Sequence, residues 1–138
     1  MAMGLAPLAW AQDCTTTEYI VPSPLYPTIQ AAIDAAPHGA FVCVGPGHHL
    51  PFDLAGKNVH GFAAIGSTFT FIDATGTGQS AVRCASGEGS GAILEDFTIT
   101  GGDVDAGGGM YVAGSSPTIR NCLFTGNHAE LGGGAYCS

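Results

Sequence analysis

Two stretches in which hydrophobic and polar residues alternate lie near the C-terminus, and they are copies of each other. Residues 94–101 align with residues 119–126, and residues 107–112 align with residues 132–137, each at a spacing of 25 and without a gap. A fixed period of this size is typical of a solenoid, because each copy can bury its apolar edge only against the next copy. The sequence therefore predicts stacked coils of about 25 residues.

Alternation within the copies predicts which side chains face the interior of the coils. Along one strand of each copy the inward positions hold Leu94, Phe97 and Ile99, then Ile119, Cys122 and Phe124. Along a second strand they hold Val82, Cys84, Met110, Val112, Ala135 and Cys137. Arg83, Tyr111 and Tyr136 then form an outward column on that second strand. Asp96 and Asn121 fall at bends, where short polar side chains tolerate left-handed dihedrals.

A helical pattern occurs near the N-terminus, at residues 28–36. Its apolar residues recur at i, i+3, i+4 and i+7, namely Ile29, Ala32, Ile33 and Ala36. Pro37 ends it, a β-prone lead-in strand precedes it at residues 14–21, and an apolar strand follows it at residues 41–44. We expect the helix to lie across the first coil as a cap, because an uncovered coil end is an aggregation-prone edge. All later elements are predicted to be short strands.

Particular residues resemble a known superfamily. Residues 26–37 read Tyr-Pro-Thr-Ile-Gln-Ala-Ala-Ile-Asp-Ala-Ala-Pro, and residues 44–47 read Val-Gly-Pro-Gly. This opening resembles that of many right-handed β-helix proteins of the pectin-lyase-like superfamily, and the two copies continue the resemblance. Phe-Thr-Gly-Asn at residues 124–127 and Gly-Gly-Ala at residues 133–135 are similar to signatures of polymorphic outer-membrane protein repeats.

The resemblance implies an all-β fold, a right-handed parallel β-helix (solenoid) with a short N-terminal capping helix. It says less about function, because this scaffold hosts lyases, hydrolases, esterases, adhesins and structural spines.

The chain divides into three predicted parts. Residues 1–11 are expected to be a truncated signal peptide, since they hold a short apolar stretch and a small-x-small pattern at residues 9–11. No Lys or Arg precedes Lys57, so either the start codon was placed too late or the segment is not a signal. Residues 12–40 are the lead-in strand and capping helix. Residues 41–138 are coils, which we expect to continue in a longer protein because terminal coils need a polar cap.

The composition argues against some classes of binding partner. Only 10% of residues are charged, 22 are glycine, and the formal net charge is −8. This acidic balance argues against nucleic acid, which requires a basic stripe, and against charge-driven binding to an anionic membrane. We therefore expect a secreted or cell-surface protein, exported by a bacterium, that meets a membrane only through a C-terminal anchor outside this sequence.

The five cysteines suit an exported chain with one disulfide. Cys14 with Cys43 is the expected pair. Cys84 and Cys137 occupy equivalent positions two coils apart, and two strand spacings of ~4.8 Å exceed the ~7 Å limit for a bridge. The remaining cysteines are expected to be small core residues.

Acidic residues are the candidates for a catalytic or metal-binding site. A glycosidase needs two carboxyl groups about 5–10 Å apart, which Glu95, Asp103 and Asp105 provide if they face one side. However, Glu95 lies opposite Arg120 in the next copy, so a surface ion pair explains it equally well. Asp103 and Asp105 are also candidates for a metal site, although a solvated turn is the simpler interpretation. We expect no cofactor and no catalytic constellation.

The histidines and the outward column are the remaining candidates for metal binding and ligand binding. His48 and His49 are adjacent, so they point to opposite faces and are poorly placed to hold one metal ion, while His60 and His128 are expected to stand alone. The column of Tyr111, Tyr136 and Arg83 is the candidate ligand-binding surface, by stacking on sugar rings. Its aromatic rings could equally stack on one another.

The function favoured by these patterns is a non-catalytic β-helix repeat module, which acts as an adhesin-like or glycan-binding spine. Its expected partner is a polysaccharide or cell-surface glycan, and edge-to-edge self-association is also expected. The alternative is the N-terminal portion of a polysaccharide lyase or glycoside hydrolase with its active site in downstream coils.

Overall fold

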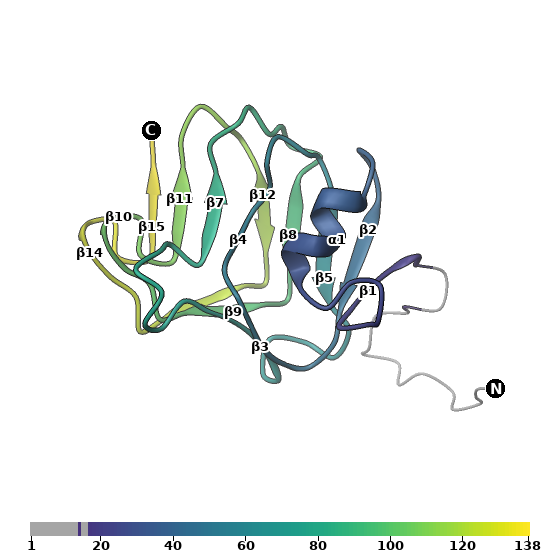
Figure 1. Ribbon diagram of the computed structural model, residues 1–138. Coiled ribbons are helices and arrows are strands. Elements are labelled where there is room, and N and C mark those ends of the chain that lie inside the picture. The colour runs from purple at the N-terminus through teal and green to yellow at the C-terminus, as the bar shows by residue number, and fades with distance from the viewer. Residues whose placement is uncertain (1–13, 15–16) are drawn as a thin grey trace.

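The chain winds as a right-handed parallel β-helix, and its axis crosses Figure 1 from the N-terminal to the C-terminal side. This computed structural model describes residue 14 and residues 17–138. The predicted signal peptide at residues 1–11 lies outside the described residues. The strands pair in parallel throughout and form three stacked sheets with a small two-stranded extension, so the predicted fold class is confirmed.

Each sheet collects one strand from successive coils. The first sheet has the order β1 (Tyr19–Val21), β2 (Phe41–Val44), β5 (His60–Ala63), β8 (Ile93–Glu95) and β12 (Thr118–Arg120). The second has the order β3 (Gly47–His49), β6 (Thr70–Asp73), β9 (Thr98–Thr100) and β13 (Leu123–Thr125). The third has the order β4 (Phe52–Asp53), β7 (Val82–Cys84), β11 (Met110–Val112) and β15 (Ala135–Cys137). The extension pairs β10 (Asp103–Ala106) with β14 (His128–Leu131).

The register of the last two coils follows the 25-residue period. Leu94 pairs with Ile119, and Met110 pairs with Ala135. Leu94, Phe97, Ile99, Val82, Cys84, Met110 and Val112 are buried, as predicted. Their counterparts Ile119, Cys122 and Phe124 pack against this core but are only half-buried, because they belong to the last coil. Asp96 and Asn121 adopt the predicted left-handed dihedrals, with φ of 67° and 49°.

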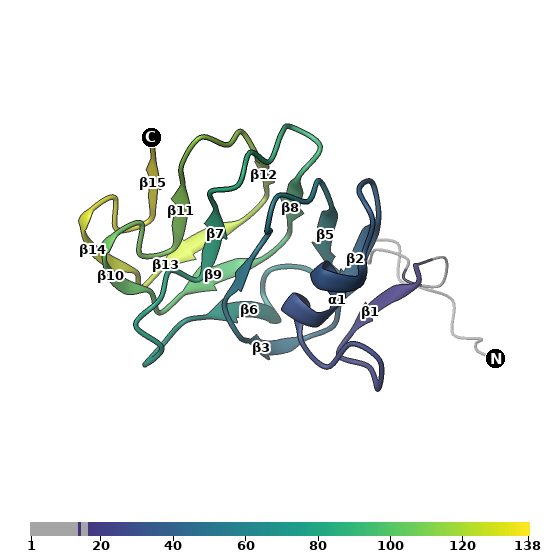
Figure 2. The ribbon, with the colours of Figure 1, turned by 45° about the horizontal axis from the view of Figure 1, so that its top comes forward.

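The helix α1 (Ile29–Ala35) lies over the N-terminal end of the solenoid, against β1, β2 and β4 (Figures 1 and 2). Thr28 caps its N-terminus, since the Thr28 side chain accepts a hydrogen bond from the Ala31 N–H. Ala36 is extended (φ −75°, ψ 141°), as expected for a residue that precedes a proline. The helix is therefore one residue shorter at each end than predicted, and it forms the expected cap.

The lead-in segment departs from the prediction. Among its described residues, strand is found only at β1, so the strand is shorter than the predicted one. The Thr17 N–H donates to the Cys14 carbonyl. A disulfide joins Cys14 to Cys43 of β2, with the two Cα atoms 5.7 Å apart, so the expected pairing is confirmed. Cys84, Cys122 and Cys137 are free. Cys84 is buried as predicted and Cys122 is half-buried, whereas Cys137 is exposed, because it lies on the last strand of its sheet, and the prediction of a core position is wrong for it.

The glycine runs are corners at which the backbones of neighbouring segments touch. Gly107 has a φ of 67°, and its counterpart Gly132 has a φ of 62°. A Cβ atom on Gly102 would overlap the Gly108 carbonyl. Only glycine fits there.

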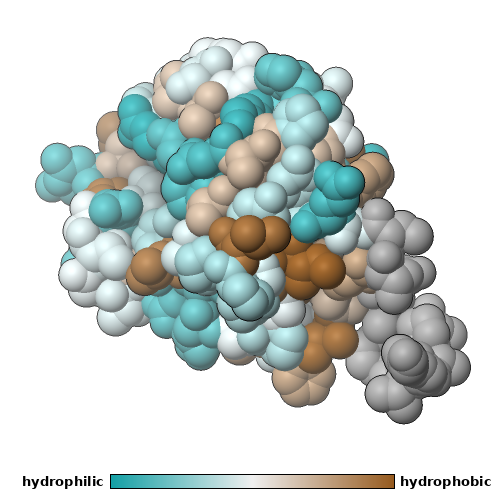
Figure 3. All heavy atoms as spheres, turned by 45° about the vertical axis from the view of Figure 1, so that its right-hand side comes forward, coloured by the Kyte–Doolittle hydropathy of each residue, from teal (hydrophilic) through white to brown (hydrophobic). Residues whose placement is uncertain are grey.

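Several large hydrophobic side chains stay on the surface. The most exposed are Leu25, Leu50, Leu131, Leu123, Phe69, Phe41 and Ile20. Figure 3 shows hydrophobic residues interspersed with hydrophilic ones on the side of the molecule that it presents. Over the described part of the chain, no helix has the length and apolar character needed to cross a membrane.

Candidate binding groove

Four outward side chains follow one another across the third sheet. Asp53 pairs in register with Arg83, Arg83 with Tyr111, and Tyr111 with Tyr136. We call these four residues the outward column. Their strand neighbours are inward and buried in β7 and β11, so alternation along each strand directs the column to the surface. The sequence predicted three members and missed Asp53.

The members of the outward column touch one another. Arg83 Nε lies 3.6 Å from Asp53 Oδ2. The Arg83 guanidinium carbon lies 4.9 Å from the centroid of the Tyr111 ring, which is a cation–π distance. The Tyr111 and Tyr136 rings stack with centroids 5.7 Å apart at 21°. The column is thus a continuous ladder of contacts, and its tyrosines stack on each other.

Asp53 is held in place from two directions. The Gln30 amide of α1 donates to the Asp53 carbonyl at 3.0 Å, and the Asp53 N–H donates to Gln30 Oε1 at 2.8 Å. The Ala55 N–H also donates to the Asp53 carboxylate, at 2.8 Å. Gln30 therefore pairs with the edge strand β4 as a neighbouring strand would, and it fixes the first member of the outward column.

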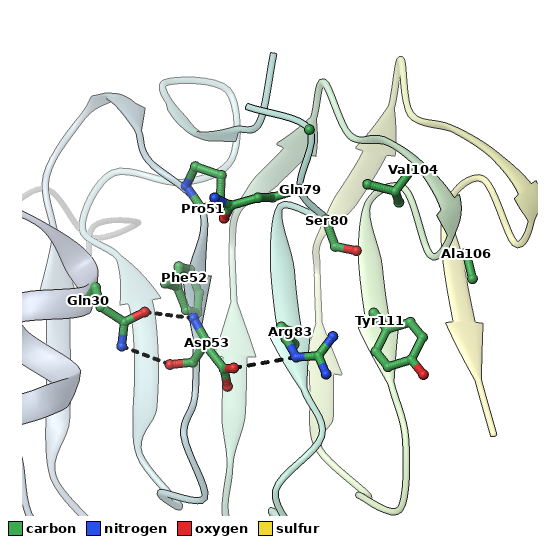
Figure 4. Close-up of a pocket in the computed structure, with 11 residues that line it drawn as sticks. Gln30, Pro51, Phe52, Asp53, Gln79, Ser80, Arg83, Val104, Ala106 and Tyr111 are labelled. Carbon is green, nitrogen blue, oxygen red and sulfur yellow. Dashed lines mark hydrogen bonds and ion pairs between the residues drawn. The ribbon is translucent and has the colours of Figure 1, made fainter. Parts of the chain in front are cut away.

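A groove of about 580 Å³ lies over the outward column (Figure 4). Its floor is made by outward side chains of β4, β7 and β11, and its wall by residues 78–80 and the β10 strand. The lining residues are Gln30, Pro51, Phe52, Asp53, Gly78, Gln79, Ser80, Arg83, Val104, Ala106 and Tyr111. Tyr136 lies one strand further along the column and does not line this groove.

The groove carries little net charge. Among its lining residues Asp53 is the one acidic and Arg83 the one basic side chain, and they face each other. The remaining polar lining groups are amides, a serine hydroxyl and a phenol. Such a surface suits a ligand rich in neutral hydrogen-bonding groups better than one of high charge.

The other predicted acidic candidates are not brought together. Glu95 lies on β8 of the first sheet, whereas Asp103 lies on β10. Glu95 is in register with Arg120, but its carboxylate lies 3.0 Å from His60 Nε2. The partner of Glu95 is therefore His60 and not the predicted Arg120. His60 reaches Glu95 from the preceding coil and is half-buried with it, whereas Arg120 is exposed.

The Asp103 carboxylate also has a histidine partner. Asp103 Oδ1 lies 3.0 Å from His128 Nδ1, and both side chains are exposed. Neither His60 nor His128 therefore stands alone, which corrects the prediction. Asp105 is exposed on the same strand. Across the described residues, no three His, Cys, Asp or Glu side chains gather closely enough to hold a metal ion.

His48 and His49 point to different partners. His48 Nδ1 lies 2.8 Å from Asp73 Oδ2, and its ring stacks on Phe71 at 4.6 Å. His49 Nε2 lies 2.8 Å from the Gly45 carbonyl oxygen. Hydrogen bonds from Thr75, aided by His48, hold the pKa of Asp73 below its ordinary value. These are surface interactions within the solenoid.

Glu88 is a buried carboxylate that the sequence did not reveal. Only 2% of it is exposed, and it accepts hydrogen bonds from the Gly56 N–H, the Ser86 N–H and the Ser115 hydroxyl, at 2.8, 3.0 and 2.7 Å. Burial alone raises the pKa of Glu88, but these hydrogen bonds outweigh it and leave the pKa below its ordinary value. Because the donors come from three successive turns, Glu88 links neighbouring coils.

No family model, curated protein or solved structure matches this chain. The fold is therefore established by the parallel, stacked sheets themselves. The candidate function rests on the groove and its chemistry.

Proposed function

We propose that this chain is a non-catalytic β-helix module that binds glycans through the groove over the outward column. The observation that supports it most is the convergence of uncharged hydrogen-bonding side chains on one open groove. A volume of about 580 Å³ falls within the usual range of about 300–1,000 Å³ for small-ligand sites. A short stretch of a polysaccharide, with its many hydroxyl groups, matches that combination of size and polarity.

The absence of a carboxylate pair in the groove supports binding rather than hydrolysis. Glycoside hydrolysis uses two carboxyl groups about 5–10 Å apart, on either side of the scissile bond. Among the residues that line this groove, Asp53 is the single carboxylate, and Arg83 and the Ala55 N–H already engage it. Glycoside hydrolysis needs a carboxylate that is free to act as base or nucleophile, together with a second acidic group.

The setting that we propose is outside the cell, in a secreted or surface-attached, adhesin-like protein. The Cys14–Cys43 disulfide supports this setting, because disulfides persist in oxidising compartments and are rare in the cytosol. Kinship with the pectin-lyase-like superfamily and with polymorphic outer-membrane repeats belongs to the same proposal. It rests on the opening residues 26–37 and on the repeat signatures.

The alternative function is the N-terminal portion of a polysaccharide lyase or glycoside hydrolase whose active site lies in further coils. The observation that supports this alternative is the Asp53 carboxylate, which faces the groove. The two functions differ in outcome. An enzyme releases new reducing or unsaturated ends from a polysaccharide, whereas a binding module retains its ligand intact.

The test is binding to a panel of neutral hexose oligomers and uronate oligomers, measured by calorimetry. Ser80→Trp fills the groove with an indole and is expected to abolish binding. Ser90→Trp is the matched control, because Ser90 lies on an exposed corner outside the groove. Binding that survives Ser80→Trp would place the ligand elsewhere, and release of new chain ends would favour the enzyme.

A further inference from the structure

The faces of the Tyr111 ring are already occupied within the outward column. Arg83 lies over the ring at 4.9 Å from its centroid, and Tyr136 stacks on it at 5.7 Å. In register, these two residues flank Tyr111 on its two neighbouring strands, β7 and β15. A sugar ring stacked on Tyr111 would have to displace one of them. With Arg83 and Tyr136 against its faces, the part of Tyr111 that remains for a ligand is the ring edge with its phenol hydroxyl.

Four side chains around the groove have hydrogen-bonding capacity that the fold does not use. Within the described residues, no hydrogen-bond partner is found for the Gln79 amide, the Ser80 hydroxyl, the terminal guanidinium nitrogens of Arg83 or the Tyr111 hydroxyl. Gln79 and Ser80 belong to the wall, and Arg83 and Tyr111 to the floor (Figure 4). By contrast, the Gln30 amide is already engaged, by two hydrogen bonds with the Asp53 backbone and one to the Asp34 carboxylate.

These two observations separate two ways of binding a sugar. Stacking uses the apolar face of an aromatic ring and the C–H face of the sugar, and it tolerates loss of the phenol hydroxyl. Recognition by hydrogen bonds uses the sugar hydroxyls and depends on each donor and acceptor. The covered faces of Tyr111 and the unused polar groups around it both favour the second way.

We infer that the groove recognises the hydroxyl-bearing edge of a sugar, and this inference rests on the proposed glycan-binding function. The groups that would contact the sugar are Gln79, Ser80, Arg83 and the Tyr111 hydroxyl. Tyr136 does not contact the ligand here and acts as a positioning residue that holds the Tyr111 ring. The planar guanidinium of Arg83 can donate to two neighbouring oxygens at once, so vicinal hydroxyl groups are its natural target.

The deciding experiment compares Tyr111→Phe with Tyr111→Ala, and its probe is the tightest-binding oligomer of the neutral hexose and uronate panel. Tyr111→Phe keeps the ladder and removes one hydrogen-bonding group, so it should weaken binding about three- to tenfold. Tyr26→Phe removes the same atom outside the groove, where Tyr26 packs against Tyr19, and should bind like the wild type. Ser80→Ala should show a similar loss to Tyr111→Phe.

Each result bears on one part of the account. If Tyr111→Phe binds like the wild type while Tyr111→Ala loses binding, the ring face makes the contact and the inference is wrong, although glycan binding stands. If the wild type binds no oligomer, the proposed function fails and the inference fails with it. In the free protein, nuclear Overhauser contacts should link the Tyr111 ring to Tyr136 and to the Arg83 methylenes. If these contacts are absent, Arg83 and Tyr136 do not cover the Tyr111 ring and the inference is wrong. This measurement needs no ligand.

Discussion

The buried Glu88 carboxylate connects three successive turns of the solenoid, and Glu88→Gln removes its charge while keeping its shape. One carboxylate oxygen accepts from both the Ser86 N–H and the Ser115 hydroxyl, and the other accepts from the Gly56 N–H. A glutamine has a single oxygen acceptor. With that oxygen facing Ser86 and Ser115, the glutamine NH₂ group would oppose the Gly56 N–H.

The expected cost follows from this arrangement. An orphaned buried donor costs about 1–3 kcal/mol, and hydrogen bonds to a neutral acceptor are worth roughly half of those to a charged one. We therefore expect Glu88→Gln to lower the free energy of unfolding by about 2–4 kcal/mol at pH 7. The assay is urea denaturation followed by circular dichroism. Glu130→Gln is the matched control on the exposed strand β14 and should change stability by less than about 0.5 kcal/mol.

The same residue predicts a pH dependence with a definite sign. The pKa of Glu88 in the folded protein lies below its ordinary value of 4.5, so the unfolded chain takes up the proton first as the pH falls. The stabilisation by Glu88 is therefore complete above about pH 5 and declines below about pH 4.5. The difference between wild type and Glu88→Gln should shrink in that range. A Glu88→Gln variant as stable as the control, or a difference unchanged from pH 7 to pH 3, would refute the reasoning.

Three further predictions test the scaffold. Removing the disulfide by Cys14→Ser with Cys43→Ser should cost about 3–4 kcal/mol in urea denaturation, because the bridge closes a loop with a sequence separation of 29, and an unchanged midpoint would contradict it. Gly102→Ala should prevent native folding as judged by circular dichroism, whereas Gly89→Ala, which has only ordinary contacts, should fold. A polypeptide of these 138 residues exposes the strand edges and half-buried apolar side chains of its last coil, so light scattering should show association that increases with concentration; a monomer at high concentration would count against this.

The solenoid could be predicted from sequence because its repeats encode register directly. Equal spacing places Leu94 on Ile119 and Tyr111 on Tyr136, so the register of the last two coils follows from one period. Arg83 precedes Tyr111 by more than that period, and alternation along its strand is what predicted its outward position. The bends at Asp96 and Asn121 were also predictable, because short polar residues suit left-handed dihedrals there.

The remaining parts of the groove could not be predicted because they depend on turns of unequal length. Asp53 pairs with Arg83 at a separation longer than the 25-residue period, so no repeat indicates its place in the column. Gln79 and Ser80 lie in a turn that has no copy elsewhere, and their approach to Arg83 follows from the path of that turn. The partner of Glu95 was mispredicted for a related reason, since register fixes neighbours but not which of two flanking coils a long side chain will reach.

The most direct test of the central claim is a titration of the isotope-labelled protein with neutral and uronate oligosaccharides, followed by amide chemical shifts. Glycan binding in the groove predicts saturable shifts at Ser80, Arg83 and Tyr111, with little change at Thr125 on β13 of the second sheet. Shifts confined to another sheet, or none with any oligosaccharide, would contradict the account.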